Sequence, residues 1–385
     1  MLKPVLSADS HVTEPPEAYA ALIDRRFKDR APRIEHDNKR GDLYVIDGIN
    51  RAIPMALLSA AGVEPTEISG LESTNTGWLQ RGGWDPQVRI ADQDRDGIAA
   101  EILYPSVGML LCKHLDFDYR KACMDAYNLW LAEYCSTNPE RLLGVGQVSM
   151  RTVDDSIAEA RKIKELGLRG IMLPGWPSED DYDSKLYDPF WDACVDLDLP
   201  VTFHHLAGRR DPNENTDSPY SDGNRGVNTK LNGWMNLVRG NQDLLAMFVL
   251  GGVFERHPAL KLICAEADAG WAPHFTYRMD YAYRHHRHHI KTEPLSKPPS
   301  EYFHHNVYLT FQDDLMAFKL RQFCNVHRLM WANDFPHFDS TWPRSQMVIE
   351  EQTADLSEEE RNLVLHDNLA ECYGLSQERV CSRRT

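Results

Sequence analysis

The 385-residue sequence lacks the features that would place it among membrane or secreted proteins. No stretch of about 18 uninterrupted apolar residues occurs in it, and no N-terminal segment combines a basic region with an apolar core. We therefore expect a soluble, cytoplasmic protein without a membrane partner. Low-complexity tracts are also absent, and a hydrophobic content of 42% is enough to build a large core.

Cysteine and positive charge are present, but not in patterns that indicate a function. The eight cysteines include no C-x-x-C pair, so neither a disulfide framework nor a zinc knuckle is indicated. Those in apolar runs, such as Cys123, Cys194 and Cys264, are expected to be buried free thiols. The formal net charge of −16 argues against nucleic-acid binding. It still allows an anionic small-molecule substrate, because local cations or a metal ion can outweigh the mean field.

Short apolar runs alternate with segments of helical periodicity along the chain. The runs typical of strands lie near residues 5, 99, 143, 170, 200, 261, 307 and 329. Strands that alternate with helices form parallel sheets, and eight such units predict one α/β domain over 1–385, folded as a distorted (β/α)8 TIM barrel. An open, doubly wound sheet is the alternative. Against it, no Gly-x-Gly-x-x-Gly turn or phosphate-binding loop follows the first strand.

Two stretches interrupt the alternation and are predicted to be insertions into the barrel. The first, at about 40–90, contains an apolar run at Leu43–Ile46 that predicts a small hairpin, followed by a cap or loop rich in Gly, Thr and Trp. The second, at 207–228, is dense in Gly, Asp, Asn and Arg. So long a polar insertion directly after a strand is usually functional, for example as a lid.

Side chains that bind metals follow the ends of several predicted strands. Asp9 and His11 share one face of the first strand, because residues two apart on a strand point the same way. The other strand ends carry His204 and His205 (fifth), Glu266 (sixth) and Asp334 (eighth). In a barrel these positions meet at the C-terminal rim, where active sites of this fold lie. Taken singly, each of these residues can instead be a satisfied polar residue or a helix cap. Together they predict one divalent metal ion, Zn²⁺ in first place and Mn²⁺ as the alternative, because buried carboxylates and imidazoles are costly unless paired or metal-bound.

The sequence also resembles a known family through four motifs. They are Asp9-x-His11, the Pro-Val-x-x-His run from Pro200 to His204, the Gly-Val-Phe-Glu-Arg-His-Pro run from Gly252 to Pro258, and Asn333-Asp334-Phe335-Pro336. In order and spacing these motifs resemble the amidohydrolase superfamily. More narrowly, residues 5–375 resemble the amidohydrolase-2 group, which includes aminocarboxymuconate-semialdehyde decarboxylase and the γ-resorcylate decarboxylases. The resemblance implies that the metal ligands are Asp9, His11, His204 and Asp334, and that the protein is a homodimer or a higher homo-oligomer.

Two positions depart from the pattern of that family. Many members open with His-x-His or Glu-x-His, whereas the first ligand position here is Asp9. The decarboxylases carry a histidine after the sixth strand, where this chain has Glu266. A carboxylate at that position can bind the metal, accept a proton from water or hydrogen-bond a substrate hydroxyl group, and the sequence leaves these three roles open.

The expected chemistry follows from the metal. A divalent ion lowers the pKa of bound water from ~15.7 toward ~7, and Asp334 is placed to take the proton and return it to a leaving group. The sequence therefore predicts, in first place, a hydrolase acting on an amide, ester, lactone or C–C bond of a small cyclic or aromatic substrate. The alternative is a non-oxidative decarboxylase of an aromatic acid, with Asp334 or Glu266 protonating the ring carbon. A catalytically inactive barrel that serves as a binding subunit is a second alternative.

Further candidates lie in the loops around the predicted rim. His337 forms a His-x-Asp pair with Asp339 and is predicted either to transfer protons in catalysis or to cap a backbone carbonyl. His205 is assigned to substrate contact, to support of the metal site or to packing. The remaining candidates for substrate binding are Arg209, Arg210 and Arg225 as cations for a carboxylate, and Trp176, with Trp78 and Trp84, as an aromatic wall. Solvated loop arginines and ordinary packing are the alternatives for these residues.

Overall fold

A computed structural model describes residues 1–385 except 50–51, 65, 68–79, 206–231, 291 and 376–385, and except the side chains of 232–238. Eight parallel strands form one sheet whose strand order follows the chain order. They are β1 (Val5–Val12), β5 (Ile98–Pro105), β6 (Leu142–Gln147), β7 (Gly170–Met172), β8 (Val201–His204), β9 (Leu262–Ala265), β10 (Val307–Phe311) and β11 (Leu329–Trp331). All eight strands predicted from the sequence are confirmed.

Backbone hydrogen bonds bring the end of the sheet back to its beginning. β11 pairs with β10, and the chain just beyond β11 runs beside β1. There the Asp334 N–H donates to the Asp9 carbonyl at 3.0 Å, and the His11 N–H donates to the Phe335 carbonyl at 2.7 Å. The predicted TIM barrel is confirmed. The open, doubly wound alternative is wrong, because the strand order shows no reversal.

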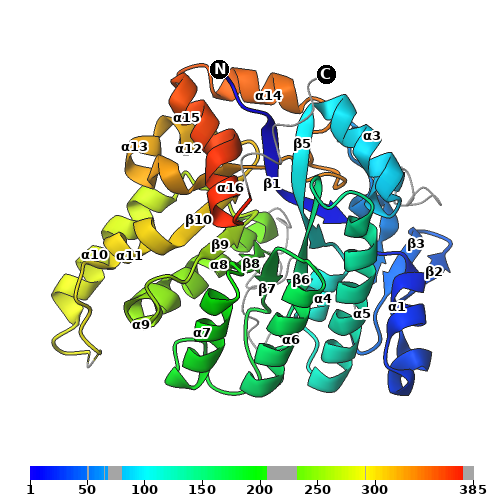
Figure 1. Ribbon diagram of the computed structural model, residues 1–385, viewed down its shortest axis with the longest axis horizontal. Coiled ribbons are helices and arrows are strands. Elements are labelled where there is room, and N and C mark those ends of the chain that lie inside the picture. The colour runs from blue at the N-terminus through cyan, green and yellow to red at the C-terminus, as the bar shows by residue number, and fades with distance from the viewer. Residues whose placement is uncertain (50–51, 65, 68–79, 206–231, 291, 376–385) are drawn as a thin grey trace.

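Helices surround the strands (Figure 1). They are α1 (Pro16–Leu22), α3 (Pro86–Asp96), α4 (Gly108–Leu111), α5 (Phe117–Ser136), α6 (Val153–Glu165), α7 (Asp188–Asp196), α8 (Asn232–Leu250), α9 (Val253–Arg256), α10 (Ala272–His286), α11 (Pro299–Asn306), α12 (Leu315–Lys319), α13 (Arg321–Cys324), α14 (Ser345–Gln352), α15 (Glu358–Asn362) and α16 (Asn368–Cys372). Local signals set their ends: the Thr152 side chain caps α6 by accepting from the Asp155 N–H. Gly167, at φ 78°, then supplies the left-handed turn that leads out of α6.

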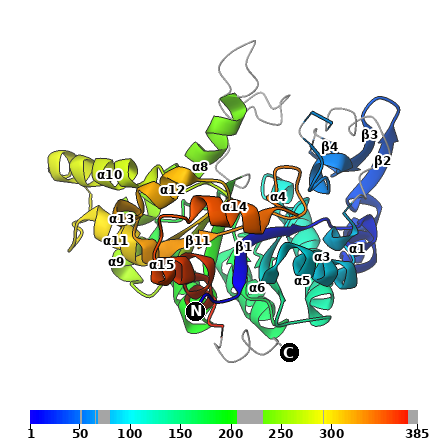
Figure 2. The ribbon, with the colours of Figure 1, turned by 90° about the horizontal axis from the view of Figure 1, so that it is seen from above.

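A small antiparallel sheet stands apart from the barrel. It contains β2 (Arg33–Asp37), β3 (Gly41–Val45) and β4 (Ile53–Pro54). The predicted hairpin at Leu43–Ile46 thus corresponds to β3, but the inserted sheet begins before residue 40, at Arg33. The sheet follows β1 and α8 follows β8, and Figure 2 shows both projecting to the same side of the barrel. The predicted insertion at 207–228 lies outside the described residues, and the assignment of 1–385 to a single domain stays a prediction.

The cysteines and the helices bear on two further predictions from the sequence. Every cysteine of the described residues is a buried free thiol, as predicted for Cys123, Cys194 and Cys264. Among the helices of the described residues, none has both the length and the apolar character needed to cross a membrane.

A buried arginine supports the junction between the first and last strands. Arg89 of α3 pairs with Glu101 of β5 at 2.6 Å, and both side chains are at most 1% exposed. The same guanidinium donates to the backbone carbonyls of His11 and Phe335 at 2.7 and 3.3 Å. One side chain therefore ties β5, β1 and the segment after β11 together.

Replacing Arg89 with methionine is expected to lower the free energy of unfolding by about 3–5 kcal/mol, because it leaves the buried Glu101 carboxylate without its cation. Urea denaturation followed by circular dichroism measures the change. The control is Arg26→Met, which breaks a pair with Asp24 in which the arginine is 72% exposed, and it should unfold like the wild type. If Arg89→Met unfolds at the same urea concentration as this control, the buried pair does not support the junction.

Candidate metal centre

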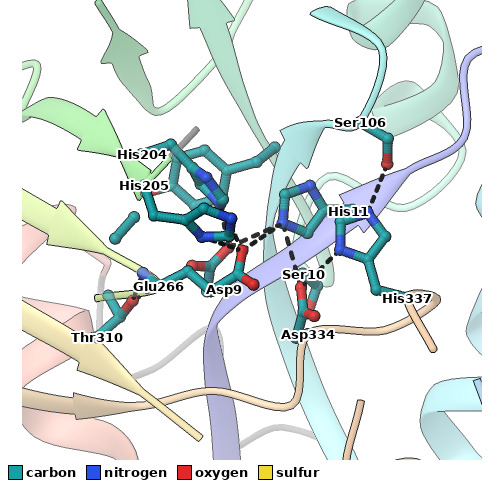
Figure 3. Close-up of polar contacts among 12 residues, drawn as sticks. Asp9, Ser10, His11, Ser106, His204, His205, Glu266, Thr310, Asp334 and His337 are labelled. Atoms are coloured by element: carbon teal, nitrogen blue, oxygen red, sulfur yellow. Dashed lines mark hydrogen bonds and ion pairs between the residues drawn. The ribbon is translucent and has the colours of Figure 1, made fainter. Parts of the chain in front are cut away.

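Side chains from distant parts of the sequence converge at the C-terminal rim of the barrel (Figure 3). Asp9 and His11 lie on β1, His204 ends β8, Glu266 directly follows β9, and Asp334 follows β11. Two overlapping groups of residues could each hold a metal ion: Asp9, His11, His204 and Glu266, and His11, Glu266, Asp334 and His337. Within each group, every residue offers one ligand atom, and these atoms lie within 4.8 Å of one another. We call these six residues the metal cluster.

His11 occupies the middle of the metal cluster. Its Nε2 lies 3.5 Å from Asp9 Oδ1 and 3.2 Å from Asp334 Oδ1. Its Nδ1 lies 3.0 Å from the backbone carbonyl of Pro105. A carbonyl contact of this kind fixes the ring orientation of a metal-binding histidine, so Nε2 is directed at the neighbouring carboxylates.

Thr310, which no sequence pattern singles out, holds both Glu266 and Asp9. Thr310 of β10 accepts a hydrogen bond from the Glu266 N–H at 2.9 Å, and its hydroxyl lies 3.2 Å from Asp9 Oδ2, to which it can donate. Glu266 Oε2 lies 3.1 Å from both His204 Nε2 and His205 Nδ1. One threonine hydroxyl thus links two carboxylates of the metal cluster.

Several atoms that point into the metal cluster are buried without a hydrogen-bond partner among the described residues. They are Asp9 Oδ1, His11 Nε2, His204 Nε2, Glu266 Oε2 and both carboxylate oxygens of Asp334. Buried polar atoms are normally hydrogen-bonded, because leaving them unsatisfied is costly. Converging imidazole and carboxylate lone pairs that the protein does not satisfy suit a divalent cation. The metal cluster is therefore a metal-binding site.

The charges of the metal cluster also favour a cation. Burial by itself favours neutral imidazole, but the neighbouring carboxylates, with Asp334 foremost at 3.2 Å from Nε2, raise the pKa of His11 well above its ordinary value. Against the same effect of burial, Asp9 and Glu266 raise the pKa of His204 to about 9. Without a metal ion, protons on these imidazoles balance the carboxylates. A divalent cation would take their place and release them.

The backbone is strained at two residues of the metal cluster. Glu266 and Asp334 have φ angles of 49° and 55°, in the left-handed region that residues other than glycine rarely adopt. Such positions cost of order 1–3 kcal/mol each and cluster at functional sites. These backbone conformations direct the carboxylates of Glu266 and Asp334 toward the metal cluster, which explains why the strain is retained.

His337 links the rest of the metal cluster to a serine. Its ring stacks on that of His11 with centroids 4.0 Å apart. Its Nδ1 lies 3.2 Å from Asp334 Oδ1, and its Nε2 lies 2.9 Å from Ser106 Oγ. The carboxylate beside His337 is therefore Asp334 and not Asp339, the partner that the His-x-Asp spacing predicted. Ser106 directly follows β5, and its place after a strand end was the only signal that could have found it.

The other predicted substrate-binding residues are placed only in part. His205 contacts Glu266 at the edge of the metal cluster, and Trp176 is half-buried in the segment after β7. Trp84 is also half-buried. The predicted candidates that lie outside the described residues are Arg209, Arg210, Arg225 and Trp78. Substrate contact by any of these residues stays a prediction.

The curated proteins that are similar in sequence to this chain include two decarboxylases. The first is 2-amino-3-carboxymuconate-6-semialdehyde decarboxylase of Dictyostelium discoideum, 28% identical over 214 residues. That match covers 52% of each protein, so the chain spans about half the length of this relative. The second is γ-resorcylate decarboxylase of Rhodococcus jostii, 24% identical over 349 residues, which cover 85% of this chain and 97% of the relative.

Solved structures share the fold. An amidohydrolase from Mycobacterium avium subsp. paratuberculosis superposes with a TM-score of 0.77 at 21% identity, covering 97% of this chain and 100% of that one. A dihydroxybenzoic acid decarboxylase from a Polaromonas species, with bound manganese and 2-nitroresorcinol, gives a TM-score of 0.64 at 18% identity and covers 98% and 99%. The family model described as Amidohydrolase matches residues 9–375. Nearly the whole chain is thus accounted for by one family, and the protein belongs to the amidohydrolases as an enzyme of that superfamily.

Proposed function

We propose that the protein is a metal-dependent, non-oxidative decarboxylase of an aromatic carboxylic acid. The sequence favours hydrolysis and gives decarboxylation as the alternative, whereas both curated relatives are named as decarboxylases, which supports the alternative. In the structure the proposal rests on the contact between Asp334 and His337 beside the cation site, because replacing a carboxyl group by hydrogen needs a proton at the ring carbon. Convergence of all four predicted metal ligands disfavours the inactive barrel.

The metal ion would be held by Asp9, His11, His204 and Asp334. When bound, it supplies positive charge that attracts substrate oxygens and stabilises negative charge developing on them. The two carboxylates of this set balance the two positive charges of a divalent ion, and the third carboxylate of the metal cluster, Glu266, lies beside them. Zn²⁺ and Mn²⁺ both suit these donors, and the Polaromonas decarboxylase is described with manganese.

The protein's own residues would handle the proton. A proton adds to the ring carbon that bears the carboxylate; the C–C bond to the carboxylate then breaks, its electron pair returns to the ring, and CO₂ leaves. We assign delivery of the proton to Asp334, whose two carboxylate oxygens have no hydrogen-bond partner among the described residues. His337 lies 3.2 Å from Asp334 and is held from its other side by Ser106, so it is suited to resupply the proton.

For substrate binding we keep the candidates that the sequence predicts. His205, Trp176 and the three arginines of the polar insertion stay candidates, the arginines because a guanidinium pairs well with a carboxylate. We also propose that the protein is cytoplasmic and forms a homodimer or a higher homo-oligomer.

The reaction type can be tested directly with ortho-hydroxybenzoic acids as substrates for the metal-loaded enzyme. We expect release of CO₂, no ¹⁸O from labelled water in the aromatic product, and, in D₂O, one deuterium at the ring position that carried the carboxylate. Mass spectrometry of the product measures both labels. No CO₂ from these acids, together with uptake of solvent ¹⁸O when their esters or lactones are supplied, would instead identify a hydrolase.

His11→Ala is expected to lose the metal ion, because it removes the nitrogen at the middle of the metal cluster. The loss of affinity should exceed the ~10–100-fold that follows removal of a residue that only supports a ligand. Elemental analysis after dialysis measures the metal content. His286→Ala, at an exposed position at the end of α10, is the matched control and should keep full metal content. Equal metal content in the two variants would exclude His11 as a ligand.

Asp334→Asn should keep most of the metal and lose turnover by ~10²–10⁴-fold, because an amide oxygen can still coordinate but cannot carry the proton. Metal content and the rate of CO₂ release are measured on the same preparation. Asp154→Asn, an exposed aspartate in the first turn of α6, serves as the control and should react like the wild type. Near-normal turnover of Asp334→Asn would remove Asp334 from proton transfer.

A further inference from the structure

Glu266 belongs to both groups of converging donor atoms. One group combines it with Asp9, His11 and His204, and the other with His11, Asp334 and His337. Within the part of the chain that the structure describes, a cation held by either group therefore also meets a carboxylate oxygen of Glu266. The three roles that the sequence leaves open for this residue can be separated by where its oxygens lie.

The Oε2 atom of Glu266, which faces His204 and His11, is shielded from solvent. Oε2 is buried, has no hydrogen-bond partner among the described residues, and lies 3.1 Å from His204 Nε2 and 3.7 Å from His11 Nε2. The side chain as a whole keeps 14% exposure, which therefore comes from atoms other than Oε2. An oxygen that solvent does not reach is suited to a buried ion, and poorly suited to a substrate hydroxyl group or to water in an open pocket.

The loop after β9 holds Glu266 in this position. The backbone of Glu266 is left-handed at φ 49°, and its N–H is fixed by the Thr310 hydroxyl, which also contacts Asp9 Oδ2. Glu266 is thereby tied to Asp9, a proposed ligand, through a single atom. Strain of this kind persists only where surrounding contacts maintain it.

We infer that Glu266 is a further protein ligand of the metal ion proposed above, and that it shifts the preference of the site toward Mn²⁺ relative to Zn²⁺. Zn²⁺ is satisfied by four nitrogen, sulfur or oxygen donors, and Asp9, His11, His204 and Asp334 already supply four. Mn²⁺ suits sites rich in carboxylate and carbonyl oxygen, with a higher number of donors. A third carboxylate therefore adds more to the binding of Mn²⁺ than to that of Zn²⁺.

The test is metal binding by the full-length protein without substrate. Dissociation constants for Mn²⁺ and Zn²⁺ are measured separately for the wild type, Glu266→Gln and Glu266→Ala, with free Mn²⁺ followed by electron paramagnetic resonance and Zn²⁺ by competition with a chelator. We expect Glu266→Ala to weaken Mn²⁺ binding by more than the ~10–100-fold that follows removal of a residue that only supports a ligand, and Zn²⁺ binding clearly less. Glu266→Gln, which keeps an oxygen and the side-chain volume, should lie between Glu266→Ala and the wild type.

The matched control is Asp268→Asn, because Asp268 is an exposed carboxylate two residues further along the same loop. It should bind both ions like the wild type. Unchanged Mn²⁺ affinity in both Glu266 variants would overturn the inference and leave Glu266 to act on water or substrate. An equal loss of both ions would overturn the stated preference. Circular dichroism of each metal-free variant shows whether it is folded, and the glutamine variant keeps the test valid if the alanine variant is not.

This experiment can fail separately from the proposed function. Metal affinities are measured in the absence of any reaction, so a product containing solvent ¹⁸O would overturn decarboxylation and leave the assignment of Glu266 intact. Conversely, CO₂ release by a protein whose Glu266 variants bind Mn²⁺ normally would keep decarboxylation and remove Glu266 from the metal.

Discussion

The site depends above all on the hydrogen bonds that join the last strand region to the first. Asp334 donates its N–H to the carbonyl of Asp9, and His11 donates its N–H to the carbonyl of Phe335. These bonds hold the backbone next to three of the proposed ligands, so the closure of the barrel and the spacing of the metal cluster are set by the same contacts. Arg89 stabilises this junction by donating to the backbone carbonyls of His11 and Phe335, and Glu101 balances the charge of its guanidinium group.

The concentration of buried charge at this junction is unfavourable without a counter-ion. Carboxylates and imidazoles at most 1% exposed lose nearly all contact with water, and protons on the imidazoles offset this loss only in part. A divalent ion offsets it more fully, because it brings two charges and accepts several lone pairs at once. Positive φ angles at Glu266 and Asp334 add local strain to the same region. The metal cluster therefore lowers the stability of the metal-free protein, and binding of a cation offsets this cost.

The sequence predicts much of this arrangement because strand ends are readable from it. The apolar runs identify all eight barrel strands, and Asp9, His11, His204, Glu266 and Asp334 stand out because each lies within or directly after such a run. Thr310 and Ser106 also lie at strand ends, but the sequence analysis did not select them, because a single hydroxyl residue there carries no distinctive pattern. The spacing of His337 and Asp339 was misleading because residues two apart share a face only on a strand. In the loop after β11 the chain turns, and His337 meets Asp334 instead.

The junction has a consequence for how the enzyme matures during synthesis. Asp9 and Asp334 come from opposite ends of the chain, and contacts so distant in sequence form late because much chain entropy must be lost before they are made. A nascent chain that still lacks the segment after β11 carries Asp9, His11, His204 and Glu266, but its β1 pairs on one side only, with β5. A product truncated before the last strand would lack Asp334 and His337, together with the hydrogen bonds that close the barrel beside Asp9 and His11.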